Sequence, residues 1–571
     1  MADQRIQYSE LMVGSGHPTK ADTLNRLALV EHNTDGTHKT LSKVTDPYRD
    51  PRADGGVGDG TTDDKTALDL TFANAVIQIP EGTWMGYDLS LSGVNRLTGL
   101  GQGSIIKCNS LAANYVIGFQ GSGQSTLVID DLVVDGNKAL GTYTGSGHGV
   151  DIRGYDEVYI GRLEVRNASG HGFQLADCAK VRIGTLVVHD CDKYGVVFDS
   201  NGGSGLSEDI NIDTLVAYNN GTANYSGINF SDLTSTPTGS RRVVIGKVLS
   251  FGNTRDGIAF GRNATSGDTG PCEIAVGEML LYSNGNYGAE LFGCHNVAIG
   301  NIVAHDNTYS GVGILHGDLA PGPEAYCENV SIGNIVSYNN GQHGVEITGG
   351  KKLHIDGIIA YNNSQTTTTT YDGVYIHETG VTSGSTINTD IVIDKLHAYD
   401  DQGTATQQYG LNVKQTVSDG GNYVRHFTAS GNVTGDYNLT WPGTPFNPIN
   451  LNGRWHSFIT TTDATANVVA LKTPVIADNS VVLAKATVIG ANSNGTVRCV
   501  YDIEHAYWKD GVNPLATMGS LVTQHSVETD VGLDALFGIA GTDRISVLVT
   551  GKAATTMTWK VYVTLDEMKA Y

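Results

Sequence analysis

The sequence has little positive charge for its length. It holds 36 Lys and Arg against 59 Asp and Glu, which gives a formal net charge of −23. An acidic surface repels the phosphates of nucleic acids and the headgroups of anionic membranes. We therefore expect neither as a partner, although this does not exclude an anionic polymer held in a local basic groove.

Long apolar runs and regularly spaced cysteines are also missing. No run approaches the ~20 residues that span a bilayer. The stretch MADQRIQYSE at the start lacks the basic and apolar regions of a signal peptide. The seven cysteines are irregularly spaced, which indicates synthesis in a reducing compartment. No grouping of Cys and His has the spacing of zinc ligands, so neither a metal nor another cofactor is predicted.

The middle of the chain is built from a repeated unit. Clear copies are VRIGTLVVHDCDKYGVVF from 181, VAIGNIVAHDNTYSGVGI from 297 and VSIGNIVSYNNGQHGVEI from 330. Each copy holds three short alternating runs, V-x-I-G, I-V-x-Y and G-V-x-I, separated by Gly, Asn or Asp. One such unit cannot bury its apolar face alone, so the units must stack. Three strands per turn, stacked in parallel, predict an all-β protein with a parallel β-helix.

Stacking places equivalent residues of successive units in columns. The inward residues of the third run predict one apolar column: Phe198, Phe230, Phe260, Leu291, Ile314, Ile347 and Ile376. The residue after the second run predicts a structural amide ladder: Asn220, Asn253, Asn284, Asn307, Asn340 and Asn363. Repeated His-Gly pairs sit in the same turn and are predicted to be turn residues: His148, His171 and His343.

The chain divides into three regions. Residues 1–48 form a separate N-terminal segment, expected to be a connector, and residues 49–440 hold the repeats. Within that region, 65–75 predict a short helix that caps the open end of the apolar column. The repeat ends near 440 at the Pro-rich stretch WPGTPFNPIN, and runs such as RISVLVTG predict an antiparallel β-sandwich over 441–571.

A family resemblance covers roughly residues 50 to 440. GVGDGTTDDKTAL followed by VIQIPEG resembles the start of the pectate-lyase-like right-handed parallel β-helix superfamily, as found in bacteriophage tailspikes. The residues that carry it are Gly58, Asp59, Gly60, Thr62, Asp63, Asp64, Pro80 and Gly82. The segment HPTKADTLNRLALVEHNTDGTHK and the C-terminal sandwich, with VYVTL close to the end, resemble parts of phage tail proteins.

The resemblance implies a homotrimeric tailspike and polysaccharide depolymerase. Such a protein is attached through its N-terminus to a phage tail or baseplate protein. It binds and cleaves a bacterial surface polysaccharide, which is a capsule, an exopolysaccharide or an O-antigen. It is assembled in the host cytoplasm as part of the virion and acts outside the cell. These families share no catalytic motif at fixed spacing, so the site must be argued from the repeat.

Two glutamates mark the candidate catalytic site. Glu290 and Glu346 occupy outward positions of third runs two rungs apart, so their backbones are predicted to lie ~9.6 Å apart. Gly313 lies between them and, because it has no side chain, is expected to leave open space between the two carboxyl groups. Glycoside hydrolysis uses two carboxyl groups, ~6.5–9.5 Å apart in inverting enzymes. The spacing favours an inverting hydrolase, whereas both could instead be solvated surface residues.

Polar residues near this pair are predicted to bind substrate. They come from the third runs and the positions just after them: Asn229, Asp232, His316, Asp318, Tyr375 and His377. A second, aromatic column ends the second runs: His189, Tyr218, Phe251, Tyr282, His305, Tyr338, Tyr361 and Tyr399. Sugars could stack on its ring faces, or a neighbouring subunit could cover it, and the second hypothesis is favoured.

Two other functions remain open. A polysaccharide lyase on the same fold needs a base and a cation that neutralises a uronic acid, and Tyr375, His377 and Lys414 could serve. Few Lys or Arg occupy outward strand positions, which disfavours an anionic substrate. A non-enzymatic receptor-binding fibre needs only the aromatic column.

Overall fold

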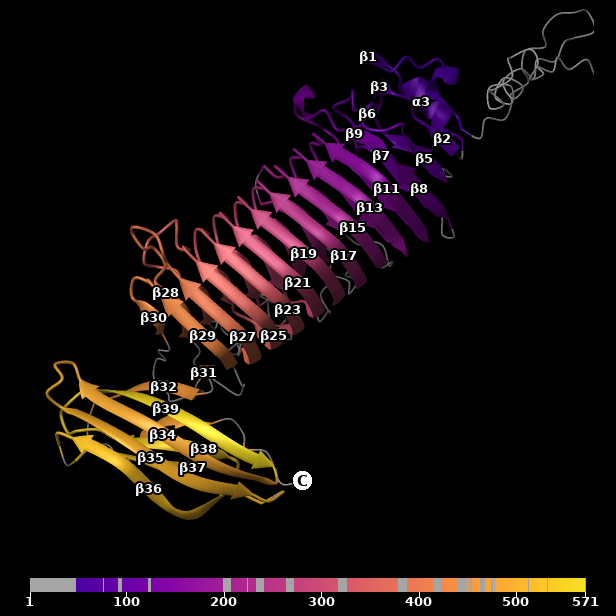
Figure 1. Ribbon diagram of the computed structural model, residues 1–571. Helices are drawn as coiled ribbons and strands as arrows, with labels where there is room; N and C mark the ends of the chain where they lie inside the picture. The colour runs from indigo at the N-terminus through magenta and orange to yellow at the C-terminus, as the bar shows by residue number, and fades with distance from the viewer. Residues whose placement is uncertain are drawn as a thin grey trace, which may run out of the picture.

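The computed structural model shows a long stack of strands followed by a smaller set of antiparallel strands (Figure 1). It describes residues 48–569 except for 75, 91–94, 122–124, 199–206, 223, 233–240, 263–271, 317–325, 378–387, 415–422, 439–448, 452–453, 463–467, 474–475, 477, 512 and 531. The N-terminal segment 1–47 lies outside the described residues. No helix in the described part of the chain is long and apolar enough to cross a membrane.

The first and second runs of each unit form one long strand rather than two. The strands, all parallel, are β11 (Glu157–Arg166), β13 (Val181–His189), β15 (Glu208–Tyr218), β17 (Arg241–Phe251), β19 (Cys272–Tyr282), β21 (His295–His305), β23 (Cys327–Tyr338), β25 (Gly350–Tyr361), β27 (Thr389–Tyr399) and β29 (Tyr423–Ser430). The glycine between the runs lets neighbouring backbones approach closely. A Cβ at Gly184 would lie only 2.6 Å from the carbonyl oxygen of Gly161.

The third runs form a separate parallel sheet. Its strands are β4 (Leu89–Ser90), β7 (Tyr115–Gln120), β10 (His148–Arg153), β12 (Phe173–Ala176), β14 (Val196–Phe198), β16 (Ile228–Asp232), β18 (Ile258–Arg262), β20 (Ala289–Phe292), β22 (Val312–Leu315), β24 (Val345–Ile347), β26 (Val374–His377), β28 (Tyr409–Lys414) and β30 (Gly435–Asn438). Each pairs with the next in the list. The expected parallel β-helix is confirmed.

Shorter elements close the N-terminal end. They are η1 (Pro51–Asp54), β1 (Asp59–Asp63), α3 (Lys65–Phe72), β2 (Val76–Gln78), β3 (Gly82–Met85), β5 (Arg96–Thr98), β6 (Ser104–Lys107), β8 (Thr126–Asp130), β9 (Leu132–Asp135) and η2 (Lys138–Leu140). Leu68 and Phe72 of α3 belong to the β-helix core, and Figure 1 places α3 at the end of the stack. The expected cap helix is present as α3, which ends at Phe72, three residues before the predicted end at 75.

The interior is an apolar column bounded by a polar ladder. All seven inward residues expected from the third run are buried: Phe198, Phe230, Phe260, Leu291, Ile314, Ile347 and Ile376. At the adjoining turn, Asn307 Nδ2 donates to Asn340 Oδ1 at 3.0 Å, and Asn340 Nδ2 donates to Asn363 Oδ1 at 3.0 Å. The same bond links the other members from Asn220 onward. The amide ladder is confirmed.

The aromatic column forms a continuous ring stack. From His189 to Tyr399, successive ring centroids lie 4.6–5.1 Å apart, and their planes differ by 9° at most. Each inner ring therefore has both faces covered by its neighbours, and only ring edges face outward. Sugar binding on these ring faces, one of the two hypotheses, is wrong because the rings already stack on one another.

The C-terminal strands pack as a sandwich with its own core. One antiparallel sheet holds β32 (Arg454–Thr461), β39 (Met557–Lys569), β34 (Ser480–Asn492), β35 (Arg498–Lys509) and β36 (Ala516–Glu528). The other holds β33 (Val468–Lys472), β38 (Arg544–Thr550) and β37 (Asp534–Ala540). The connecting strand β31 (Ile449–Leu451) pairs in parallel with β29 and in antiparallel with β32.

The amide ladder should contribute measurably to stability. Asn340 is fully buried, and Asn340→Ala removes bonds to Asn307 and Asn363 at once. We expect the free energy of unfolding to fall by about 2–4 kcal/mol, because buried polar groups lose their partners. The control is Asn334→Ala, which breaks the exposed bond to Asn301 and should change stability by less than about 0.5 kcal/mol. Equal denaturation curves for both variants would contradict a stabilising ladder.

Candidate functional site

The two candidate glutamates lie on one face of the third-run sheet. Glu290 on β20 pairs with Gly313 on β22, and Gly313 pairs with Glu346 on β24. The register continues from Glu346 to Tyr375 on β26 and from Tyr375 to Asn412 on β28. The predicted order of rungs is confirmed. Both glutamates are largely buried, with side-chain exposures of 12% and 14%, so neither is a freely solvated surface residue.

Gly313 does not leave an open floor between the two acids. The ring of Tyr287 lies over it, so that a Cβ at Gly313 would come within 3.0 Å of Tyr287 Cδ1 and Cε1. Tyr287 belongs to the turn before β20, and its hydroxyl donates to Glu346 Oε2 at 3.1 Å. The expectation of an empty gap is wrong, because glycine makes room for a side chain from the preceding turn.

Three polar groups hold the Glu346 carboxylate. Tyr287 donates to Oε2, Ser310 Oγ donates to the same oxygen at 3.3 Å, and His377 Nε2 lies 3.0 Å from Oε1. Burial alone would raise the pKa of Glu346. The hydrogen bond with His377 and the charges of His343 and His377 outweigh it, so the pKa is lowered overall. Glu346 is thus an oriented, ionised carboxylate.

Glu290 lies in the opposite environment. Its neighbour Asp256, in the turn before β18, is fully buried. Arg255 contacts both acids, with Nε 3.0 Å from Asp256 Oδ2 and Nη2 3.5 Å from Glu290 Oε2. Burial, followed by the charge of Asp256, raises the pKa of Glu290 well above its usual range, against the opposing charge of Arg255. Glu290 keeps its proton at pH values where an ordinary glutamate has lost it.

Aromatic rings border the Glu346 end of the site. The Tyr375 ring stacks on His343 at a centroid distance of 4.5 Å and on His377 at 4.1 Å. Lys414 Nζ lies 5.5 Å from the centroid of Tyr375. Burial raises the pKa of Tyr375 to about 12, so its hydroxyl keeps its proton at neutral pH. Tyr375 and His377, both predicted from the sequence, do lie beside Glu346.

The other predicted binding residues lie less favourably or are not described. Asn229 and His316 are 4% and 6% exposed, which leaves little surface for a sugar. The His316 ring packs edge-on against Tyr326, with centroids 5.4 Å apart. Asp232 belongs to β16, but its side chain lies outside the described part of the chain, as does all of Asp318.

Most of the side chains around Glu290 and Glu346 that were not predicted as site residues come from one turn position. It is the residue directly before the glycine of the third run: Asp256, Tyr287, Ser310, His343 and Asp372. The turn role expected for His343 is confirmed, since its Nδ1 accepts from the backbone N–H of Asp372 at 2.9 Å. The same ring also contacts Tyr375. A signal was present, because successive units place polar residues here beside the glutamate column.

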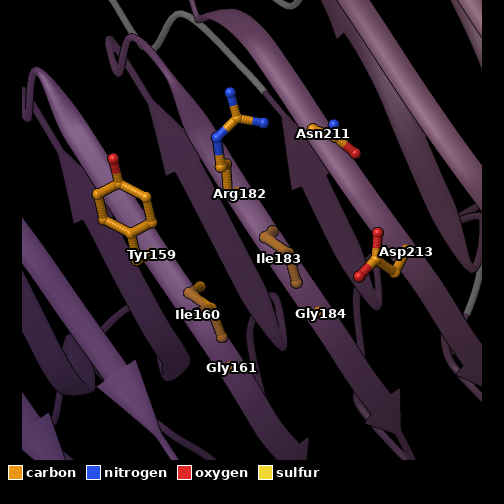
Figure 2. Close-up of a pocket in the computed structure, with 8 residues that line it drawn as sticks. All are labelled: Tyr159, Ile160, Gly161, Arg182, Ile183, Gly184, Asn211 and Asp213. Carbon is orange, nitrogen blue, oxygen red and sulfur yellow. The ribbon is translucent and has the colours of Figure 1, made fainter.

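Two other groupings lie on the long-strand sheet, away from the glutamates. Figure 2 shows a shallow pocket on β11, β13 and β15 that is lined by Tyr159, Ile160, Gly161, Arg182, Ile183, Gly184, Asn211 and Asp213. Farther along, ligand atoms of His354, Asp356 and Asp394 lie within 4.8 Å of one another. Arg425 Nη1 already lies 2.9 Å from Asp394 Oδ1, so a cationic side chain neutralises part of this acidic group.

No family model and no curated protein matches this chain. Among solved structures, a mannuronan C-5 epimerase A-module of Azotobacter vinelandii is 18% identical, covers 71% of this chain and 97% of its own, and has a TM-score of 0.43. A tailspike protein of Acinetobacter baumannii bacteriophage Fri1, a capsular polysaccharide depolymerase, is 12% identical over 91% and 86%, with a TM-score of 0.31.

The catalytic unit of a GH87 α-1,3-glucanase from Streptomyces thermodiastaticus is 11% identical over 71% of each chain, with a TM-score of 0.34. These matches are polysaccharide-active proteins by name, and phage tailspikes are distant matches among them. At such identities the similarity concerns the fold and leaves the reaction of this chain open.

The packing of Tyr287 on Gly313 can be tested by adding one methyl group. Gly313→Ala places a Cβ against the Tyr287 ring and should displace it from Glu346. We expect a loss of about 1–3 kcal/mol in the free energy of unfolding, measured by denaturation, since the turn must shift. Gly261→Ala is the matched control, because no heavy atom lies within 4 Å of its Cβ position. Equal losses in the two variants would contradict this contact.

Proposed function

We propose that this protein is an endo-acting glycoside hydrolase that cleaves a bacterial surface polysaccharide, with Glu290 as general acid and Glu346 as general base. One observation carries the proposal. Two carboxyl groups stand on one face of the sheet, two rungs apart, and their surroundings drive their pKa values in opposite directions. A pair of carboxyl groups with separated pKa values is what assigns acid and base roles in glycosidases.

The proposed reaction uses the two acids in turn. Glu290 donates its proton to the glycosidic oxygen as the bond to carbon breaks. Glu346 accepts a proton from a water molecule, whose oxygen attacks the same carbon from the opposite face. Tyr287, Ser310 and His377 hold Glu346 in place for this step. The two rungs place the backbones of Glu290 and Glu346 ~9.6 Å apart, which is closer to the carboxyl separation of inverting enzymes than to that of retaining ones and so favours inversion.

A lyase reaction on the same face is the second candidate. It is favoured by one contact, since Lys414 lies over the Tyr375 ring and could neutralise a uronic acid. Two observations weigh against it. The raised pKa makes Tyr375 a poor base at neutral pH, and the cation beside Glu290, Arg255, is already paired with Asp256.

The glutamate roles can be tested by isosteric substitution. We expect Glu290→Gln and Glu346→Gln each to lower kcat by roughly 10²–10⁴-fold, because each removes one proton transfer. Activity is followed as new reducing ends released from the host polysaccharide. Glu278→Gln, an exposed position on β19, is the matched control and should keep full activity. Folded variants of either site glutamate with full activity would contradict the assignment.

The same digestion separates the candidate functions. Reducing ends without an ultraviolet-absorbing unsaturated sugar indicate hydrolysis, whereas the two together indicate elimination by a lyase. If the protein binds the polysaccharide tightly but does not change its size, the protein is a receptor-binding fibre without enzymatic activity.

We further propose a homotrimeric virion tailspike, attached to the phage tail or baseplate through residues 1–48 and held together partly by the sandwich. The support is an exposed apolar edge. Strand β36 pairs only with β35 among the described strands, and its Met518, Val522 and Val527 are 45%, 53% and 53% exposed. Long apolar edge strands are normally covered in the functional assembly.

The trimer is tested by mass. Sedimentation of the full chain should give about three times the 60.4 kDa of one subunit. Val522→Lys should lower that mass, because a charge at an edge that the trimer covers is costly to bury. Lys560→Glu, on strand β39, is the control and should leave the mass unchanged. A monomeric full chain would contradict the proposed assembly.

A further inference from the structure

Asp256 is a buried carboxylate that the proposed hydrolysis does not use. Ser226 Oγ donates to its Oδ2 at 2.9 Å. Asn286 Nδ2 and the backbone N–H of Tyr287 donate to its Oδ1 at 2.8 and 3.2 Å. The Asp256 carboxyl group thus accepts three hydrogen bonds, and Arg255 lies beside it. The turn before β18 therefore fixes this acid next to Glu290.

Arg255 lies between this charge and Glu290. A guanidinium within reach of a carboxyl group normally favours the ionised form and would remove the proton that a general acid needs. Here its shorter contact, 3.0 Å, is to Asp256, and its contact to Glu290 is 3.5 Å. The negative charge of Asp256 thus offsets the positive charge of Arg255, so Arg255 favours the ionised form of Glu290 less than it would alone.

We propose that Asp256 is a positioning residue that pairs with Arg255 and so keeps the Glu290 carboxyl protonated for donation to the substrate. This inference rests on the proposed function. It gives Arg255 a defined task as well, because the cation allows a second acid to be buried beside Glu290 without leaving two uncompensated charges.

Few other charges reach Glu290. The remaining titratable groups that face it in the described structure are Tyr194, Tyr287 and Cys294. Burial raises the pKa of each of these three groups, so all stay neutral around neutral pH. The residues beside Glu290 on the adjacent rungs, Ala259 and Gly313, carry no charge. Burial makes the largest contribution to the raised pKa of Glu290, and the balance between the charges of Asp256 and Arg255 is the next contribution.

The test is the pH dependence of kcat/KM on the host polysaccharide. In Asp256→Asn a negative charge that favours the proton is lost, and the charge of Arg255 then favours ionised Glu290. The pKa of Glu290 falls, so activity is lost from a lower pH upward. We expect the alkaline limb to move down by about 1–3 pH units. The acidic limb, set by Glu346, should stay in place, which a merely structural defect would not predict.

A charge-balanced pair of variants supplies the control. Arg255→Gln alone should move the alkaline limb to higher pH, and the double variant Arg255→Gln with Asp256→Asn should return it toward the wild-type position. An alkaline limb that is unchanged in folded Asp256→Asn overturns the inference. If Asp256→Asn does not fold, an unchanged limb in Arg255→Gln overturns it instead.

The outcome is separable from that of the proposed function. If Glu290→Gln keeps full activity, Glu290 is not the general acid, and the proposed hydrolysis is wrong. Loss of activity in Glu290→Gln, together with an unshifted limb in Asp256→Asn, removes only the role of Asp256.

Discussion

The hydrogen bonds between parallel strands set the position of every side chain that matters here. Each strand pairs with its equivalent in the next unit, so residues far apart in sequence stand one rung apart on the same face. The apolar column, the amide ladder and the ring stack are three results of this one constraint. The column that holds Glu290 and Glu346 is a fourth, on the outward face of the third-run sheet.

The candidate site combines two columns that belong to different parts of the unit. Strand residues supply the acids Glu290 and Glu346, and turn residues supply what surrounds them. Asp256 precedes Glu290 by one rung, and Tyr287 crosses Gly313 to reach Glu346. Glu290 thus receives its charged neighbours from the turn of an earlier unit, whereas Glu346 is surrounded by groups from earlier units, from its own turn and from the later strand β26. These different surroundings shift the pKa values of two chemically identical side chains in opposite directions.

Much of this arrangement follows from the repeat, and part of it does not. The common face of Glu290 and Glu346 could be predicted, because the side-chain period of a strand and the length of a unit determine it. The position of the Tyr287 ring over Gly313 could not be predicted, because it depends on a side-chain rotamer that the backbone pattern does not determine. The protonation of Glu290 could not either, because it depends on burial and on Arg255, one residue outside the column. The sequence predicts the column of aromatic rings. That the ring faces are covered could be seen only from the orientation of each ring plane in the structure.

Tyr287 and Glu346 are 59 residues apart in the chain yet touch through one hydrogen bond. Segment 317–325 enters between β22 and β23 without changing the register of the strands on either side. Separation along the chain is therefore independent of separation across the face that carries Glu290 and Glu346. An insertion between two units can therefore differ in length without moving Glu290 and Glu346 relative to each other, because the strand pairing alone fixes their separation.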